Sequence, residues 1–254
     1  TEHTGVSFSA YTFGDPEVAR RELARLSTWS VEHRESGNKV EPSLESVLPE
    51  VRHLVAAGRT PVILVEPSDN IGGGAPGDTT TFLKAFLAEP FENSAVVIND
   101  PAAVSSLADA KPGETRTLTI GAALSSSFCE PVELDVEFVS SSDGRFELED
   151  RHSHLASMNG VNINMGPSAV VRARGVSILL TTRKTPPFDL GQLRSQGIIP
   201  EGCSVIGVKA AVAHRQGYDP ITAATWTVNV PGPCSSDMIG FPFKIVRRPI
   251  YPLD

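Results

Sequence analysis

Cysteine is scarce in this sequence, and its positions form no recognisable pattern. Cys129, Cys203 and Cys234 are the only three among 254 residues, and they lie far apart. An odd number at wide spacing excludes a disulfide framework or a zinc ribbon, because both need closely spaced pairs. We expect free, buried or incidental thiols, as in a cytoplasmic protein. A catalytic cysteine is the less common alternative for any of them.

Long apolar runs and basic clusters are missing as well. A membrane helix needs about 20 consecutive apolar residues, whereas the longest candidates here, such as residues 176–180, have the length of a strand. Lysine and arginine number 22 against 30 acidic residues, so the formal charge is −8. The basic residues are scattered, which does not support nucleic-acid binding. The polar start predicts no secretory leader, and we expect a cytoplasmic protein with neither a membrane nor a nucleic-acid partner.

The short motifs of self-contained hydrolases and nucleotide-binding proteins are also absent. The sequence has no H-E-x-x-H helix, no G-x-S-x-G turn, no Walker loop and no spaced G-x-G-x-x-G. The first residue is Thr1, and an N-terminal threonine can become a nucleophile after self-cleavage. We regard this as the less common explanation, because any fragment must also begin at some residue.

The first part of the chain predicts an α/β fold with a mostly parallel sheet. Capping residues mark helix starts, and short apolar runs mark buried strands. The expected elements are a strand at 6–13, helices at 15–34 and 43–57, a strand at 62–65, a helix at 82–87, a strand at 95–98 and a helix at 101–108. Strands that alternate with helices favour a parallel sheet with covering helices. We assign residues 1–110 to this α/β part.

From residue 111 onward short strands dominate, so we assign residues 111–254 to a β-rich part. A tight hairpin is expected around Arg174-Gly175, and the proline-rich tail at 244–254 is expected to lie across the surface. The expected strands are 115–120, 132–138, 145–148, 161–164, 170–173, 176–181, 204–209 and 222–230, with a short helix at 189–195.

The densest chemistry lies between a predicted strand and a predicted helix, at residues 66–81. The run Gly72-Gly73-Gly74 can turn its backbone amides toward a ligand because no Cβ intervenes. Asp69-Asn70 places two polar side chains at the end of the strand, and Asp78 or Thr79 can cap the following helix, whose N-terminus favours an anion. Many α/β proteins build a ligand site this way. A plain turn is the competing interpretation, and the pair Asp69-Asn70 favours the ligand site.

A second polar group lies between residues 205 and 220. Lys209 closes an apolar strand, where a long cation is costly unless it meets a carboxylate or an anionic ligand. His214 follows five residues later, with a cation, a phenol and a carboxylate close behind it. Lys209 in a structural ion pair and His214 as a helix cap explain the pattern equally well. Both alternatives stay open.

A His-x-His pair, His152 and His154, follows Asp150. Alternate residues on a strand face the same side, so both imidazoles could ligate one metal ion if a third ligand came from elsewhere. An exposed polar loop is the more common explanation. An independent hydrolase built on this pair requires metal bound to this chain alone.

Several stretches, taken in order, resemble one protein family. The sequence D-N-I-G-G-G-A-P-G-D at residues 69–78 resembles the D-N-P-G-G-G-x-P-G-D motif of the MlrC-like (microcystinase C-like) metallopeptidases. Residues 164–172 resemble that family's M-G-P-x-A-V-x-R strand, and residues 176–184 resemble the strand that follows it. Residues 208–220 and 247–254 match its closing segments. The resemblance spans nearly the whole chain, from about residue 10 onward.

The resemblance implies a zinc-dependent amide hydrolase that acts on small peptides or related amides. In such an enzyme the metal lowers the pKa of a bound water and polarises the scissile carbonyl. The implied role of Asp69-Asn70 is catalytic, orienting the substrate or a metal-bound water. The amides of Gly72-Gly73-Gly74 would receive a carboxylate or a developing oxyanion. Asp78, Lys209 and His214 are the further residues expected to bind substrate.

Two departures from the family pattern matter. Ile71 stands where the family has proline, which could loosen the loop without removing its amides. Family members are also about twice as long, and their metal-binding Asp and His residues lie in an upstream α/β region that this sequence lacks. We therefore interpret the chain as a carboxyl-terminal portion. Residues 1–40 would be the tail of an upstream domain, and the zinc would be bound by that domain or by a partner chain.

The alternative from another class is a non-catalytic binding or assembly module. Its glycine loop would cap a neighbouring domain or bind a small anion. The place where a ligand binds, in the glycine loop or elsewhere, separates the two hypotheses. The substrate, the metal and the oligomeric state, a homo-oligomer included, stay open at this point.

Overall fold

The computed structural model describes residues 2–38 and 40–254, and they fall into two units. Unit 1 comprises Thr1–Val40 and Ser236–Asp254, and unit 2 comprises Glu41–Ser235. Thr1, and with it the nucleophile hypothesis, lies outside the described residues.

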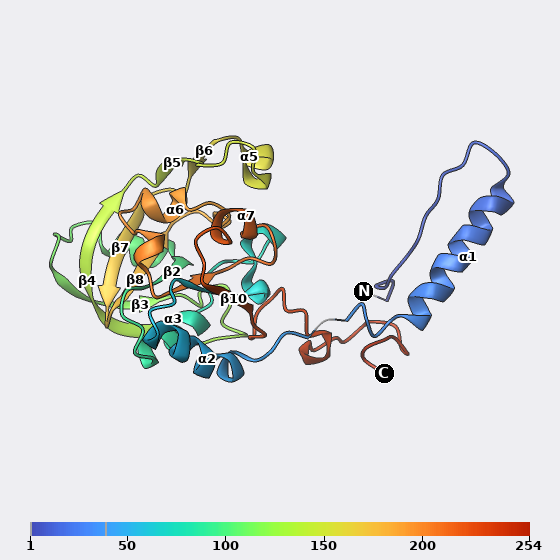
Figure 1. Ribbon diagram of the computed structural model, residues 1–254, viewed down its shortest axis with the longest axis horizontal. Helices are drawn as coiled ribbons and strands as arrows, with labels where there is room; N and C mark the ends of the chain where they lie inside the picture. The colour runs from blue at the N-terminus through green and yellow to red at the C-terminus, as the bar shows by residue number, and fades with distance from the viewer. Residues whose placement is uncertain (1, 39) are drawn as a thin grey trace. The chain divides into compact units, whose positions relative to one another are not determined.

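Unit 2 is built around an eight-stranded sheet (Figure 1) with the strand order β10-β1-β9-β2-β8-β7-β4-β3. The strands from β10 to β8 run parallel to one another, whereas β7, β4 and β3 are antiparallel to their neighbours. The α/β class with a mostly parallel sheet is confirmed. The strands are β1 (Val62–Val65), β2 (Ser94–Asn99), β3 (Thr115–Ile120), β4 (Val132–Ser142), β7 (Ser168–Ala173), β8 (Val176–Thr181), β9 (Val205–Val208) and β10 (Ala224–Thr227).

The change in sequence character near residue 110 falls inside this one sheet. Strands β1 and β9 are buried at every position, as expected for strands covered on both faces. Strand β3 instead alternates between buried and more exposed residues toward its end, and the first half of β4 also alternates. The sequence change therefore coincides with β3 and β4, which are partly open to solvent, whereas β7, β8 and β9 are largely buried.

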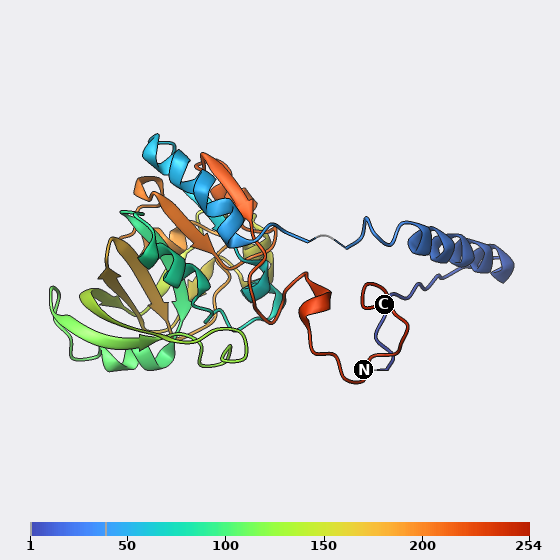
Figure 2. The ribbon, with the colours of Figure 1, turned by 90° about the horizontal axis from the view of Figure 1, so that it is seen from below.

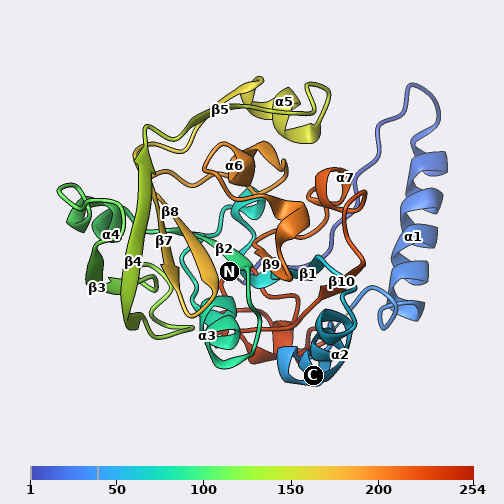
Figure 3. The ribbon, with the colours of Figure 1, turned by 60° about the vertical axis from the view of Figure 1, so that its left-hand side comes forward.

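Helices cover the two faces of the sheet (Figure 3). Because alternate residues of a strand point to opposite faces, Val62 and Leu64 of β1 join one core cluster while Ile63 and Val65 join the other. The first face carries α2 (Leu44–Ala56), α3 (Thr81–Ala88) and α4 (Pro101–Ser106). The second carries α5 (His154–Asn159), α6 (Gly191–Arg194), α7 (Arg215–Tyr218) and a small sheet of β5 (Arg145–Glu147) and β6 (Asn162–Asn164).

Local sequence explains where two of these helices begin. Ser43 caps α2, because its hydroxyl accepts a hydrogen bond from the Ser46 N–H at 3.3 Å. Asp100 caps α4 through the Ala103 N–H at 2.9 Å, and Pro101 then occupies the first helical position. In Figure 2 the blue helix α2 lies alongside the red-orange strand β10.

Unit 1 contains α1 (Pro16–Glu32), which Asp15 caps by accepting from the Glu17 N–H. The strand predicted at residues 6–13 is wrong: these residues are irregular in the described structure. An extended segment becomes a strand only when a neighbouring strand pairs with it, and unit 1 has none among its described residues. No helix in the described part of the chain is long and apolar enough to cross a membrane.

The tight hairpin predicted around Arg174-Gly175 is confirmed. Ala173 of β7 pairs with Val176 of β8, which leaves a two-residue turn. Both turn residues have positive φ, 45° at Arg174 and 79° at Gly175. This is the geometry of a turn that favours Asn-Gly.

Replacing Arg174 by Asn is expected to stabilise unit 2. Asn tolerates the left-handed region better than Arg, so the free energy of unfolding should rise by about 0.5–1 kcal/mol. Denaturant unfolding measures the change. Arg172→Asn, on the extended part of β7, is the matched control and should give no gain. Equal gains in both variants would contradict the turn argument.

Candidate functional site

The predicted glycine loop leaves the carboxyl edge of the parallel strands beside a buried charge cluster. Strands β1 and β9 pair in register, with Val65 opposite Val208. The next residues, Glu66 and Lys209, therefore emerge side by side at the same edge. The Lys209 Nζ lies 3.0 Å from Glu66 Oε2, and both side chains are buried.

Asp69 and Thr79 complete this cluster. The Lys209 Nζ lies 2.9 Å from Asp69 Oδ2 and donates to the Thr79 carbonyl oxygen at 2.9 Å. The Thr79 hydroxyl lies between the acids, 2.7 Å from Glu66 Oε1 and 2.8 Å from Asp69 Oδ2. Of the two alternatives for Lys209, the structure shows the buried ion pair.

The charges of the cluster balance when Glu66 is protonated. Burial raises the pKa of Glu66, the Asp69 charge adds to this effect, and Lys209 only partly offsets it. Burial alone would lower the pKa of Lys209, but the two carboxylates outweigh burial and raise it. A neutral Glu66, a charged Asp69 and a charged Lys209 leave no net charge in the interior, where an unpaired charge is very costly.

The same assignment satisfies the hydrogen bonds around Thr79. A hydroxyl carries one proton, so Thr79 cannot donate to both acids that it contacts. A protonated Glu66 can donate to the Thr79 hydroxyl, which then donates to Asp69. The Lys209 ammonium group contacts Asp69, Glu66, the Thr79 carbonyl oxygen and also the Thr79 hydroxyl oxygen.

Asp69 also closes the glycine loop from the inside. Its Oδ1 accepts from the Gly77 N–H at 2.8 Å, and its Oδ2 accepts from the Thr79 N–H at 2.9 Å. The residue is fully buried and both oxygens are occupied. In this arrangement Asp69 faces the protein interior, which is the geometry of a residue that positions the loop.

The three loop glycines differ in what their amides contact. The Gly73 N–H donates to Asn70 O and the Gly74 N–H donates to Ile71 O, each at 3.0 Å. Within the described residues the Gly72 N–H is the one of the three without an internal acceptor. Gly72 is therefore the loop amide that a ligand can reach without breaking an existing hydrogen bond.

Asn70 lies next to Gly72 and has an unused side chain. Its Oδ1 is buried and makes no hydrogen bond within the described part of the protein. That oxygen lies 3.2 Å from where a Cβ on Gly72 would be. The backbone oxygen of Asn70 meanwhile accepts from Gly73 and Ala75, which fixes the residue at the loop.

The loop after β8 packs against the glycine loop. The Lys184 Nζ donates to the carbonyl oxygens of Gly74 and Ala75 at 3.1 and 3.3 Å. The Phe188 ring lies so close to Gly72 that an added Cβ would be 2.6 Å from its Cζ. The His154 ring lies 6.4 Å from the Phe188 ring, so Phe188 and His154 extend the wall beside Gly72.

Neither Asp78 nor Thr79 caps the following helix, so that expectation is wrong. Helix α3 begins at Thr81, with Thr80 at the cap position. The buried Asp78 carboxylate instead accepts from the Leu124 N–H at 2.6 Å and from the Ser125 hydroxyl. Asp78 therefore holds the segment after β3 against the glycine loop.

His214 lies at the start of α7 and is almost fully buried. Burial lowers the pKa of its imidazole, and neither ring nitrogen has a hydrogen-bond partner among the described residues. Its nearest ring is Tyr218, 6.3 Å away in an edge arrangement. The residue does not join the Lys209 cluster by any hydrogen bond in the described structure.

The two histidines of the His-x-His pair are not on a strand. His152 lies in a turn and His154 is the first residue of α5, so the alternation argument does not apply to them. Across residues 2–38 and 40–254 no group of three or more His, Cys, Asp or Glu side chains could hold a metal ion. The described residues therefore do not fit a zinc site.

Sequence reasoning missed Glu66 and Phe188 as parts of this site and gave Thr79 only as a possible helix cap. Glu66 and Thr79 flank the predicted loop, and the buried cation predicted at Lys209 was a signal that a carboxylate must lie nearby. For Phe188 no local signal existed, because it reaches the loop from a distant part of the chain.

A known protein family matches most of the chain. The family described as MlrC C-terminus matches residues 64–244, from inside β1 to beyond the end of unit 2. The chain belongs to this family. The resemblance to the MlrC-like metallopeptidases is thereby confirmed, and the glycine loop, Lys209 and His214 all lie within the MlrC C-terminus match.

Two relatives are much longer than the aligned region. Microcystinase C of Sphingomonas sp is 24% identical over 164 residues, which is 64% of this chain and 31% of that protein. A crystal structure from Mesorhizobium sp. BNC1, provisionally assigned as a metallopeptidase, matches with a TM-score of 0.80 and 24% identity. That match covers 93% of this chain and 46% of the other, and it establishes the shared fold.

Two carboxylate-to-amide variants of the same size test the charge cluster. At or below pH 4.5, Glu66→Gln should change the free energy of unfolding by about 1 kcal/mol or less, because Gln replaces a neutral acid and can both donate and accept hydrogen bonds. Asp69→Asn should cost about 3 kcal/mol or more, because it leaves Lys209 without its charged partner and points N–H groups at other donors. Denaturant unfolding of both variants measures the difference, and similar losses would contradict the assignment of the proton to Glu66.

The same variants have an expected pH dependence. Folding raises the pKa of Glu66 above 4.5. Its stabilising contribution is therefore fully present below pH 4.5 and is lost as the pH rises through the raised folded-state value. The unmodified protein should lose stability relative to Glu66→Gln between acidic pH and that value. A constant difference across this range would contradict a protonated Glu66.

Proposed function

We propose that this chain is the carboxyl-terminal part of a zinc-dependent amide or peptide hydrolase and supplies one wall of its substrate cleft. The observation that carries the proposal is the glycine loop, which the buried cluster of Glu66, Asp69, Thr79 and Lys209 holds in one conformation. The loop leaves the Gly72 N–H and the Asn70 side chain without internal partners. Membership of the MlrC C-terminus family supports the same conclusion.

The chemistry of amide hydrolysis explains why such a loop is useful. Negative charge develops on the carbonyl oxygen, and N–H donors that are already in place stabilise it without reorganisation. In the proposal the Gly72 N–H donates to the reacting carbonyl or to a carboxylate of the substrate, and the unpartnered Asn70 Oδ1 accepts from a substrate N–H. Fixed donors at a strand edge are worth more than mobile ones, because no ordering is needed when the substrate binds.

The other predicted residues have positioning roles in this proposal. Asp69 and Lys209 fix the loop from the interior, while Gly73 and Gly74 close its turn through their own amides. Asp78 holds the adjoining segment. His214 is proposed as a further contact, because its two ring nitrogens need partners that the described residues do not supply.

The zinc ion is proposed to be bound outside this chain. No cluster of metal-ligating side chains occurs in the described residues, and the chain spans less than half of either relative. The proposal places the metal in the region that the longer relatives have in addition to this one.

The same additional region is the proposed partner of unit 1. Helix α1 buries none of its residues, and Val6, Tyr11 and Phe13 are 85%, 98% and 112% exposed. Apolar residues in such number are costly to leave in water. The structural relative covers 93% of the chain, more than unit 2 alone accounts for. We propose that residues 6–13 and α1 pack against this additional, upstream region.

The inward position of Asp69 favours a second candidate, a binding or assembly module without catalysis. If the loop only caps a neighbouring domain, a buried carboxylate that rigidifies it is sufficient, and the Asn70 side chain would contact protein and not substrate.

Asn70→Ala in the longer protein, with the upstream region present, separates the two candidates. Because the side chain makes no internal hydrogen bond, the midpoint of thermal unfolding should be nearly unchanged. The value of kcat/KM for a peptide amide should fall by about one to two orders of magnitude, because a substrate N–H loses its hydrogen-bond acceptor. Steady-state kinetics measure this, and the exposed Asn162→Ala on β6 is the matched control. Full activity in Asn70→Ala would favour the assembly module.

Tryptophan fluorescence tests the partner of unit 1. The chain has two tryptophans, and Trp29 on α1 is 54% exposed. In Trp226→Phe the remaining Trp29 should emit at shorter wavelength in the longer protein than in the 254-residue chain, because the upstream region removes it from water. In Trp29→Phe the remaining Trp226, which packs on the core of unit 2, should not shift. Identical Trp29 spectra would contradict the proposed contact.

A further inference from the structure

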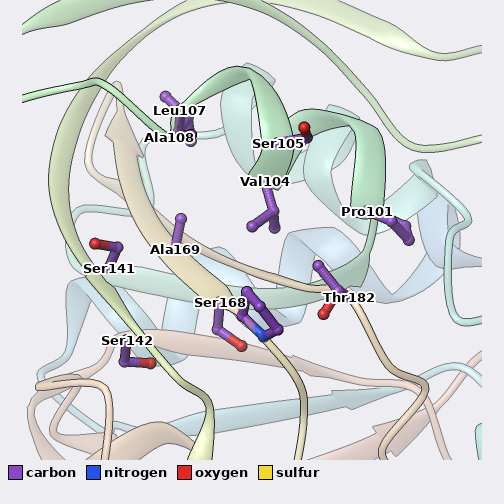
Figure 4. Close-up of a pocket in the computed structure, with 11 residues that line it drawn as sticks. Pro101, Val104, Ser105, Leu107, Ala108, Ser141, Ser142, Ser168, Ala169 and Thr182 are labelled. Carbon is purple, nitrogen blue, oxygen red and sulfur yellow. The ribbon is translucent and has the colours of Figure 1, made fainter.

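A pocket of about 390 Å³ lies apart from the glycine loop, between α4 and strands β4 and β7 (Figure 4). Its volume is within the range of small-molecule sites. In Figure 4, Val104 projects from α4 into the space above Ser168 of β7, and Ala169 and Thr182 lie to either side. The proposed function does not use this pocket.

The lining is largely apolar and carries no charge. Val104, Leu107 and Ala169 supply apolar surface, and none of the described residues that line the pocket is Asp, Glu, Lys, Arg or His. A charged ligand group would lose its hydration here and gain no opposite charge. The described lining therefore offers no opposite charge to an anionic or a cationic occupant.

Two of the hydroxyls at the pocket already donate hydrogen bonds to other parts of the protein. Ser142 donates to Gln196 Oε1 at 2.6 Å, and Ser168 donates to the Gly166 carbonyl oxygen at 2.8 Å. Toward the pocket these oxygens can only accept hydrogen bonds. A carboxylate or phosphate, which needs donors, gains nothing from them, whereas an apolar group or a neutral N–H is tolerated.

The pocket and the glycine loop lie along the same edge of the sheet. Pro101 lines the pocket and follows two residues after Asn99, whose N–H donates to Gly77 O at 2.9 Å. Thr182 also lines it and precedes Lys184, which holds the loop carbonyl oxygens. Strands β2 and β8, which end at Asn99 and Thr181, are neighbours.

We propose that this pocket binds an uncharged, apolar side chain of the amide substrate and so selects among substrates. That the occupant belongs to a substrate rests on the proposed function. That the occupant is uncharged and apolar rests on the residues that line the pocket. One large aliphatic or aromatic side chain fits the volume and the absence of charge. The pocket is then a specificity element beside the donors of the glycine loop.

A binding experiment tests the pocket without catalysis. The isotope-labelled 254-residue chain is titrated with N-acetylphenylalanine amide and, separately, with N-acetylglutamate amide, and the backbone amide shifts are followed by NMR. The phenylalanine probe should shift Ser105, Ala108 and Thr182, and the glutamate probe should not. Ser105→Glu places a carboxylate at the pocket and should weaken the binding of the phenylalanine probe by on the order of tenfold.

Ser106→Glu on the same helix is the matched control, because Ser106 is exposed and does not line the pocket. It should bind the phenylalanine probe like the unmodified chain. In the longer protein, Ser105→Glu should lower the ratio of kcat/KM for an apolar over an acidic substrate side chain, and Ser106→Glu should not.

The outcomes separate this inference from the proposed function. If the phenylalanine probe shifts no pocket residue, or binds equally well to Ser105→Glu, the inference is overturned even when the longer protein hydrolyses amides. If the probe binds as expected and Ser105→Glu weakens it, while the longer protein hydrolyses no amide, the proposed function fails and the apolar pocket stands.

Discussion

The buried contact between Lys209 and its acids is the interaction on which the arrangement of the site depends. Parallel pairing of β1 with β9 brings Lys209 to Glu66, and the adjoining turn brings Asp69 to the same ammonium group. A cation in this interior is tolerated only because these partners are present. The cluster in turn fixes Thr79 and the amide of Gly77, and so the whole glycine loop. The register between β1 and β9 thereby determines the conformation of the glycine loop.

The sequence indicated the location of this site better than the orientation of its side chains. The α/β class, the loop after β1 and the need of Lys209 for a partner followed from local patterns, because apolar runs and costly buried charges are visible in sequence. That Asp69 points inward did not follow, because its partners Lys209 and Gly77 are set by tertiary structure. The strand expected at 6–13 needs a pairing strand, which local pattern does not supply.

Unit 1 and unit 2 each have groups that lack a favourable partner within the described residues. Unit 1 exposes apolar side chains such as Tyr11 and Phe13, whereas unit 2 leaves buried polar atoms at Asn70 and His214 without partners in the described residues. Apolar exposure and unpartnered polar groups are both unfavourable, and both are relieved by a further region of protein or by a ligand. The partial coverage of the longer relatives is consistent with such a region.

The strand order has a consequence for how the protein folds. Strand β9 lies between β1 and β2, although those two strands precede it by more than a hundred residues. Until β9 inserts, each of them has an unpaired edge and Glu66 has no cation, since Lys209 is 143 residues away in the chain. Contacts between residues so far apart in sequence form slowly, because the chain loses conformational entropy on closing the long loop before the contacts stabilise it. We therefore expect the glycine loop to acquire its final shape only in the late, rate-limiting stage of folding, and partly folded chains with open strand edges to be the species prone to aggregate.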